Sequence, residues 1–325
     1  MSFATDLFKL VNMVPLDNAA SGEKKAQILK QIEDIGNRDV DSPHSPRILL
    51  EYLASQDPEV LVSALQASGT YVSDIELFEE VFRLAQEHEH EEVRGMAAST
   101  LGNLIHDGLG YEEDVPDEIE LSVPGVNPEF YYRVKEFLLS RVDALMESME
   151  VRRRILESLG YLAWKPEIHE LILRFYHQAP NPWVKVSALY AMGLVRDPIF
   201  ERIILEELFN ENESILIEAA HAAHTLELYA AEQRLWELVH HPSLDVRCEC
   251  VVALGVLGDL TLLPDLLSQM ESEDRDLEEM TLAVEQARAM VKQRSMLEQG
   301  DDLWDDNRVL SEIDEMLENP GNIPE

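Results

Sequence analysis

An aliphatic residue with a glycine nine positions after it recurs along this 325-residue chain at nearly constant spacing. The recurring aliphatic residues, here called anchors, are Val60, Val93, Val151, Val184, Ile215, Val246 and, more weakly, Leu277. Their spacings are 33, 58, 33, 31, 31 and 31 residues, so one interval is about 25 residues longer than its neighbours. Self-similarity at a period of roughly 20 to 50 residues is typical of solenoid proteins, in which each unit buries its apolar face against the next.

Signals for the two ends of a helix fall at fixed distances from each anchor. Helix N-cap residue types dominate three positions before the anchor, at Asp57, His90, Ser148, Asn181, Asn212, Ser243 and Asp274. Glycine dominates nine positions after it, at Gly69, Gly102, Gly160, Gly193 and Gly255, with His224 as the exception. Glycine is expected where a helix ends or a second backbone approaches closely. Each anchor therefore opens a predicted helix, here called the B helix of its repeat.

A second helix, the A helix, is predicted before each B helix. The A helices begin at a capping box over 73–76, at Asn-Pro 127–128, at Asp-Pro 197–198, and near 166, 231 and 260. A single helix pair cannot bury its own apolar face, whereas six or seven stacked pairs make a continuous core. The predicted fold class is therefore all-α, a right-handed α-solenoid (superhelix) of about six to seven helix pairs.

Four segments match one another closely: EEVRGMAASTLG (91–102), MEVRRRILESLG (149–160), NPWVKVSALYAMG (181–193) and LDVRCECVVALG (244–255). A basic residue follows the anchor in each of them, as Arg94, Arg152, Lys185 and Arg247. This pattern resembles the HEAT-repeat family, in particular the short HEAT-like repeats of the phycobilisome-lyase type. The resemblance spans roughly residues 43–291 and implies the fold, but HEAT repeats serve many functions.

Three regions are predicted. Residues 1–42 form a helical N-terminal cap, with helices at about 5–14 and 22–35. Residues 43–294 form the repeat array, with an acidic insertion at 106–126 that is either functional or merely mobile. Residues 295–325 form an acidic C-terminal tail with a short amphipathic helix, which would dock in the array's own groove, dock on a partner or stay in solvent. The predicted tail-docking residues are Leu303, Trp304, Leu310, Ile313 and Leu317.

The chain carries a net charge of −38, from 64 acidic and 26 basic residues. Such a surface repels phosphate backbones and anionic lipids, so neither direct nucleic-acid binding nor membrane binding is expected. It suits a basic partner, and an acidic decoy for basic nucleic-acid-binding proteins is one alternative function. No apolar run reaches the roughly 18 to 20 residues that span a bilayer, and the N-terminus lacks the order of a secretory signal. We therefore expect a cytoplasmic protein.

Motifs for catalysis are missing from the sequence. It holds no phosphate-binding glycine loop, no dinucleotide fingerprint and no serine nucleophile elbow. One class of HEAT-repeat enzymes, the deoxyhypusine hydroxylases, binds two irons through His-Glu pairs at the start of B helices. The matching positions here are Gly95-Met96, Arg153-Arg154, Val186-Ser187, Ile217-Glu218 and Cys248-Glu249, which contain no histidine. The expectation is a protein without catalytic residues, cofactor or metal.

Two other histidine groups contain residue types that can bind metal ions. The HEHEE segment at 88–92 is interpreted as a solvated turn between helices, although imidazole and carboxylate can bind divalent ions. His221 and His224 share a helix but have no acidic third ligand nearby in the sequence, so they are interpreted as packing or surface residues.

A partner would bind along the B helices, at positions two and six residues after the anchor, which project away from the buried stripe. In repeats four to six these positions are largely apolar: Val186, Tyr190, Ile217, His221, Cys248 and Val252. Exposed apolar patches mark interaction sites. The predicted function is a non-enzymatic scaffold or adaptor that binds a partner protein or peptide in this concave groove. The alternatives are a groove covered by the chain's own tail, ordinary packing between repeats, and a lyase-type or other enzyme subunit that holds a small ligand there.

Overall fold

The computed structural model describes residues 19–38, 42–113, 115–116, 125–194, 197–273 and 277–304. These ranges contain fifteen α-helices, three short 3-10 helices and no strand, which confirms the predicted all-α fold class. None of the described helices combines the length and the apolar character needed to span a membrane. The chain divides into two compact units, Met1–Val195 and Arg196–Glu325.

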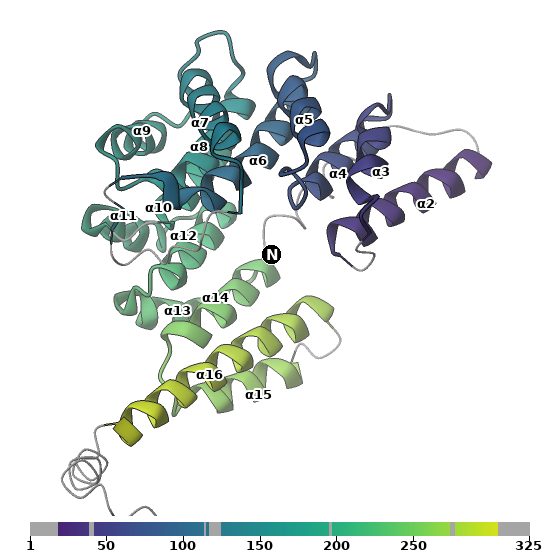
Figure 1. Ribbon diagram of the computed structural model, residues 1–325. Coiled ribbons are helices and arrows are strands. Elements are labelled where there is room, and N and C mark those ends of the chain that lie inside the picture. The colour runs from purple at the N-terminus through teal and green to yellow at the C-terminus, as the bar shows by residue number, and fades with distance from the viewer. Residues whose placement is uncertain are drawn as a thin grey trace, which may run out of the picture. The chain divides into compact units, whose positions relative to one another are not determined.

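The first unit is a stack of four helix pairs (Figure 1). The A helices are α3 (Ser45–Leu53), α5 (Ile75–Glu87), α7 (Pro128–Val142) and α9 (Pro166–His177), and the B helices are α4 (Pro58–Ser68), α6 (Glu91–Asp107), α8 (Met149–Leu159) and α10 (Pro182–Met192). Each B helix contacts its own A helix, and α4, α6 and α8 each also contact the next B helix. Short 3-10 helices, η2 (Leu109–Tyr111) and η3 (Gly160–Leu162), follow α6 and α8.

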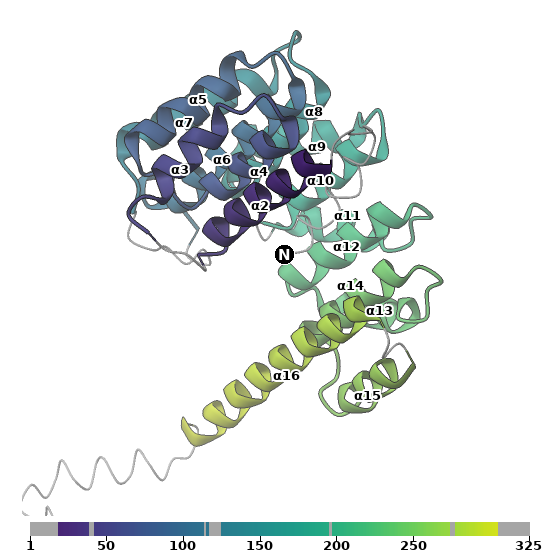
Figure 2. The same cartoon turned by 90° about the vertical axis from the view of Figure 1, so that its right-hand side faces the viewer.

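Helix α2 (Ala19–Gly36) precedes this stack and packs against α4 (Figure 2). It occupies the second of the two helices predicted before residue 42, extended by a few residues at its start. The other predicted helix, at about 5–14, lies outside the described residues.

The second unit contains three helix pairs. They are α11 (Pro198–Glu207) with α12 (Glu213–Thr225), α13 (Glu232–Leu238) with α14 (Leu244–Leu257), and α15 (Leu263–Glu273) with α16 (Glu278–Trp304); η4 (Tyr229–Ala231) leads into α13. The B helices α12, α14 and α16 pack in that order (Figure 1). Helix α16 runs past residue 294, so the boundary predicted between array and tail lies inside a helix.

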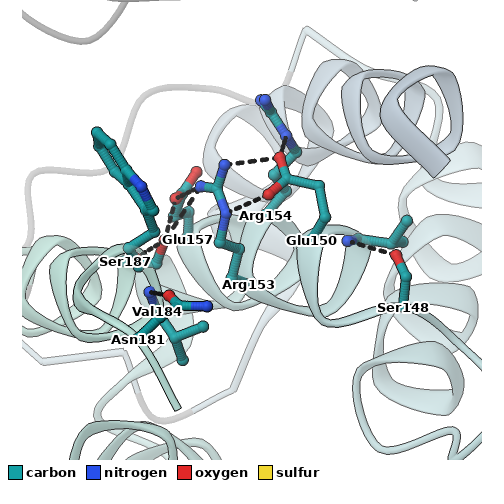
Figure 3. Close-up of polar contacts among 10 residues, drawn as sticks. Ser148, Glu150, Arg153, Arg154, Glu157, Asn181, Val184 and Ser187 are labelled. Atoms are coloured by element: carbon teal, nitrogen blue, oxygen red, sulfur yellow. Dashed lines mark hydrogen bonds and ion pairs between the residues drawn. The ribbon is translucent and has the colours of Figure 1, made fainter. Parts of the chain in front are cut away.

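The anchors are buried as predicted in six repeats, with exposed fractions between 0% and 5%. The seventh anchor is wrong, because Leu277 is 37% exposed whereas Met280, three residues later, is fully buried. Four predicted N-cap side chains accept a hydrogen bond from a backbone N–H of the first helical turn: Asp57, Ser148, Asn181 and Asn212 (Figure 3 for Ser148 and Asn181). His90 and Ser243 occupy the N-cap without such a bond, and α5 is capped by Asp74 rather than by Ser73.

In three repeats the arginine after the anchor donates to a carbonyl at the end of the preceding A helix or in the turn that follows it. Arg94 Nη1 donates to the His88 carbonyl at 2.8 Å, Arg152 Nε to the Val142 carbonyl at 2.6 Å, and Arg247 Nη1 to the His241 carbonyl at 3.1 Å. The carbonyl of Val142, the last residue of α7, has no partner within its helix and carries partial negative charge, which the Arg152 guanidinium satisfies. The residue pattern of the repeat therefore fixes the turn between its A and B helices.

Candidate functional site

The six predicted partner-binding residues are distributed over both units. Val186 and Tyr190 lie on α10 of the first unit. Val186 is only 2% exposed, so the predicted projection away from the buried stripe is wrong for this side chain. A helical wheel treats one helix alone, whereas α10 packs laterally against α8 and α9. Tyr190 is partly exposed.

The other four residues lie on two adjacent B helices of the second unit. Ile217 and His221 are on α12, Cys248 and Val252 are on α14, and all four side chains are partly exposed. Helices α12 and α14 pack together (Figure 1), and these four partly exposed side chains are here called the α12/α14 face.

The five predicted tail-docking residues do not all belong to the part of the chain that the structure describes. Leu303 and Trp304 are the last two residues of α16. Leu310, Ile313 and Leu317 lie outside the described residues.

Two histidines and a glutamate meet between α12 and α14, and are called here the His–Glu cluster: His221, His224 and Glu249. The distance from His221 Nδ1 to Glu249 Oε1 is 3.1 Å, and that from His224 Nδ1 to the same oxygen is 3.6 Å. The two imidazole rings are nearly perpendicular, at 85°, with centroids 4.8 Å apart. The side chains of His224 and Glu249 are 12% and 10% exposed, and that of His221 is 29% exposed.

Burial shapes the protonation of this cluster. Burial lowers the pKa of His224, and the charge of His221 lowers it further, while the Glu249 carboxylate acts in the opposite direction. The lowered pKa favours the neutral imidazole. The Nδ1 atom of His224 is buried and has no hydrogen-bond partner in the described structure.

The cluster is not evident from the sequence because its members belong to different repeats. Glu249 follows His224 by 25 residues, which is far in sequence but less than one repeat. His221 and His224 stand six and nine positions after the anchor Ile215, and Glu249 stands three positions after the anchor Val246. One signal was available: His224 occupies the position at which the other repeats carry glycine.

In the first unit, the positions six residues after one anchor and three residues after the next carry other polar side chains (Figure 3). Glu157, six residues after its anchor, accepts a 2.5 Å hydrogen bond from Ser187, three residues after the next anchor. Arg153 donates to both Glu157 and Glu150, at 3.2 and 2.6 Å. Burial alone would raise the pKa of Glu150, but the hydrogen bonds and charges of Arg153 and Arg154 lower it below its usual value. Here arginine side chains neutralise the carboxylates of Glu150 and Glu157.

The acidic insertion is anchored at Glu112, where its run of acidic residues begins. The Glu112 side chain is 5% exposed, pairs with Lys135 and with Lys165, the latter at 2.8 Å, and accepts a hydrogen bond from Tyr131. Burial opposes ionisation, but the lysines and Tyr131 hold the pKa of Glu112 at about 2. The Tyr111 hydroxyl donates to the Val126 carbonyl at 2.8 Å, which ties the two ends of the insertion together.

The described structure also exposes apolar side chains that the repeat pattern does not single out. Leu145 and Met146, in the turn between α7 and α8, are 94% and 98% exposed. Trp183, at the start of α10, is 48% exposed. A shallow hollow of about 320 Å³ lies elsewhere in this unit, against Ser42, Pro43, Pro46 and Tyr71. It is lined by none of the predicted site residues.

No family model matches the chain, and no curated protein matches it. Among solved structures, the Escherichia coli protein YibA is 14% identical with a TM-score of 0.42, over 85% of this chain and 99% of that one. Human deoxyhypusine hydroxylase in complex with glycerol is 14% identical with a TM-score of 0.36, over 83% and 99%. An engineered protein is 16% identical with a TM-score of 0.37, over 85% and 76%. The fold assignment rests on the helix pairs of the chain itself.

Proposed function

We propose that this chain is a non-enzymatic HEAT-like repeat protein that binds a basic, partly apolar segment of a partner protein on the α12/α14 face. The observation that carries the proposal is the partial exposure of Ile217 and Val252 on two adjacent B helices. Aliphatic side chains gathered at the surface favour the docking of an amphipathic segment, since covering them removes apolar area from water.

The charge of the second unit favours a basic partner. Residues 197–304 carry 24 acidic and 7 basic residues. Glu213 and Asp245, at the starts of α12 and α14, are both exposed. A lysine- or arginine-bearing segment would be steered toward this field, and its apolar residues would provide the contact that survives salt.

The proposal can be tested by selecting peptides from a displayed random library on the full chain. The wild type is compared with an Ile217→Asp, Val252→Asp double variant. The matched control is Leu145→Asp with Met146→Asp, which adds the same charge at two nearly fully exposed positions. We expect selected peptides to combine Lys or Arg with Leu or Phe, to lose about 10-fold or more in affinity for the face variant, and to bind the control normally.

Three results would contradict the proposal. Equal affinity for the face variant would remove the α12/α14 face from partner binding. Loss of affinity only in the control variant would move the site to the turn at Leu145 and Met146. Peptides rich in Lys and Arg, without apolar residues and released by moderate salt, would favour the acidic decoy. Circular dichroism of each variant checks that it is folded.

A further inference from the structure

We propose that His221, His224 and Glu249 form a binding site for a divalent transition-metal ion of the Zn²⁺ or Fe²⁺ class. The inference is independent of the proposed partner, because it rests on the contacts within the His–Glu cluster and not on what covers the α12/α14 face.

The geometry of the cluster is close to that of a metal site. One ligand atom from each residue lies within 4.8 Å of the other two. Metal–ligand bonds of about 2.0 to 2.2 Å in a tetrahedral site place ligand atoms roughly 3.3 Å apart. The distances from Glu249 Oε1 to His221 Nδ1 and His224 Nδ1, 3.1 and 3.6 Å, bracket that value. Only the distance between the two imidazole nitrogens has to shorten, and rotation of the partly exposed His221 ring can shorten it.

The charge of Glu249 is the second argument. Two other carboxylates whose side chains are at most 5% exposed face cations: Glu112 pairs with Lys135 and Lys165, and Glu147 pairs with Arg94. Among the described residues, neither a lysine nor an arginine pairs with Glu249. The basic groups within 4 Å of its carboxylate are the imidazoles of His221 and His224. A buried carboxylate without a cation is costly. A divalent ion would supply the missing positive charge.

The buried Nδ1 of His224 is the third argument. A buried polar atom without a hydrogen bond is uncommon and calls for an explanation such as a bound ion. Coordination of Nδ1 would satisfy this atom and the carboxylate together.

The ligand set indicates the kind of ion and the kind of site. Two imidazoles with one carboxylate suit borderline transition metals rather than Mg²⁺ or Ca²⁺, which take oxygen ligands. Three protein ligands leave at least one coordination position for water or for a ligand from outside. The His221 side chain is 29% exposed, so solvent reaches the cluster on this side.

The test uses the full chain, stripped with a chelator and titrated with Zn²⁺ against a chromophoric competitor, and then with Co²⁺ as an optical probe. The informative variants are Glu249→Gln, which keeps the shape of the side chain, and His224→Ala. The matched control is His88→Ala with His90→Ala, which removes two histidines from the HEHEE turn. We expect one tight equivalent in the wild type and the control, and affinity weaker by about 100-fold or more in Glu249→Gln and His224→Ala.

Thermal unfolding provides the second readout. Added Zn²⁺ should raise the midpoint of the wild type and of the control but not that of Glu249→Gln, because a ligand that binds the folded state stabilises it. The intensity of the Co²⁺ visible bands should indicate four or five ligands. The proposal is overturned if the wild type binds no Zn²⁺ equivalent tightly, if Glu249→Gln binds it as well as the wild type, or if binding disappears only with His88 and His90.

Discussion

His221 of α12 and Glu249 of α14 are joined by a 3.1 Å contact that links the sixth position after one anchor to the third position after the next. In the first unit, Glu157 and Ser187 are joined by a 2.5 Å hydrogen bond between the same two positions. The repeat thus places a polar pair between neighbouring B helices in both units. In the first unit that pair is part of an arginine–glutamate cluster (Figure 3), whereas in the second it brings two imidazoles to a carboxylate. A change of side chains at fixed repeat positions changes the available chemistry without changing the fold.

Substitution of Gly102 tests how closely two B helices approach. A Cβ added at Gly102 on α6 would lie 2.0 Å from Ser158 Oγ and 2.5 Å from Ser158 Cβ on α8. Alanine favours a helix over glycine by about 1 kcal/mol, but overpacking costs about 1 to 3 kcal/mol, so we expect Gly102→Ala to destabilise the protein. Chemical unfolding measures the difference. The double variant Gly102→Ala, Ser158→Gly should recover part of the loss, and a Gly102→Ala protein as stable as the wild type would show that the helices separate easily.

Neutralising Glu112 tests the anchoring of the acidic insertion. We expect Glu112→Gln to lower the free energy of unfolding at neutral pH by about 1 to 3 kcal/mol, because it weakens the pairing with Lys135 and Lys165. The pKa of Glu112 falls from 4.5 to about 2 in the folded protein, so its stabilising contribution is complete above pH 4.5 and is lost as the pH falls toward 2.

Urea unfolding of both proteins at pH values above and below 4.5 measures this contribution. The difference between wild type and Glu112→Gln should shrink on acidification. Glu113→Gln, at the exposed neighbouring residue, is the control and should change stability by less than about 0.5 kcal/mol. A difference that does not depend on pH would show that the carboxylate charge is not what stabilises this turn.

The helix pairs could be predicted from sequence because their signals are local. Anchors, caps and glycines recur within a few residues of one another, and each marks one helix or one turn. The error at Leu277 arose where this pattern is weakest, since no glycine nine residues later supports that anchor. Met280 takes the buried position instead.

The site could be predicted only in part, because it depends on contacts between repeats. The partial exposure of Ile217 and Val252 follows from a helical wheel, but the burial of Val186 depends on the neighbouring helices, which the wheel omits. The pairing of Glu249 with two histidines requires α12 and α14 to be placed side by side. Likewise, the acidic run that begins at Glu112 gives no sign in the sequence that the Glu112 carboxylate meets Lys135 and Lys165.

The two cysteines should differ sharply in reactivity. Cys250 is fully buried, and burial, followed by the charge of Glu249, raises the pKa of its thiol. Cys248 is partly exposed. Because the thiolate is the reactive form, we expect an alkylating reagent to modify Cys248 in the folded protein and Cys250 only after unfolding. Mass spectrometry of the labelled peptides locates the modification. Cys248→Ser should leave no rapidly labelled thiol, and rapid labelling of Cys250 would show that α14 opens readily.

Aspartate at Val186 and at Tyr190 should separate folding from binding on α10. Val186 is 2% exposed, so Val186→Asp would bury a carboxylate among apolar side chains, and we expect a loss of about 3 kcal/mol or more in the free energy of unfolding. Tyr190 is partly exposed, and Tyr190→Asp leaves the new charge in contact with water, so we expect a loss of about 1 kcal/mol. Chemical unfolding of the two variants against the wild type measures both values. If Val186→Asp proves as stable as Tyr190→Asp, the side chain at 186 reaches solvent and becomes a candidate for partner contact again. If Val186→Asp is much less stable, as expected, Tyr190 is the position on α10 at which a change in binding can be interpreted without a change in folding.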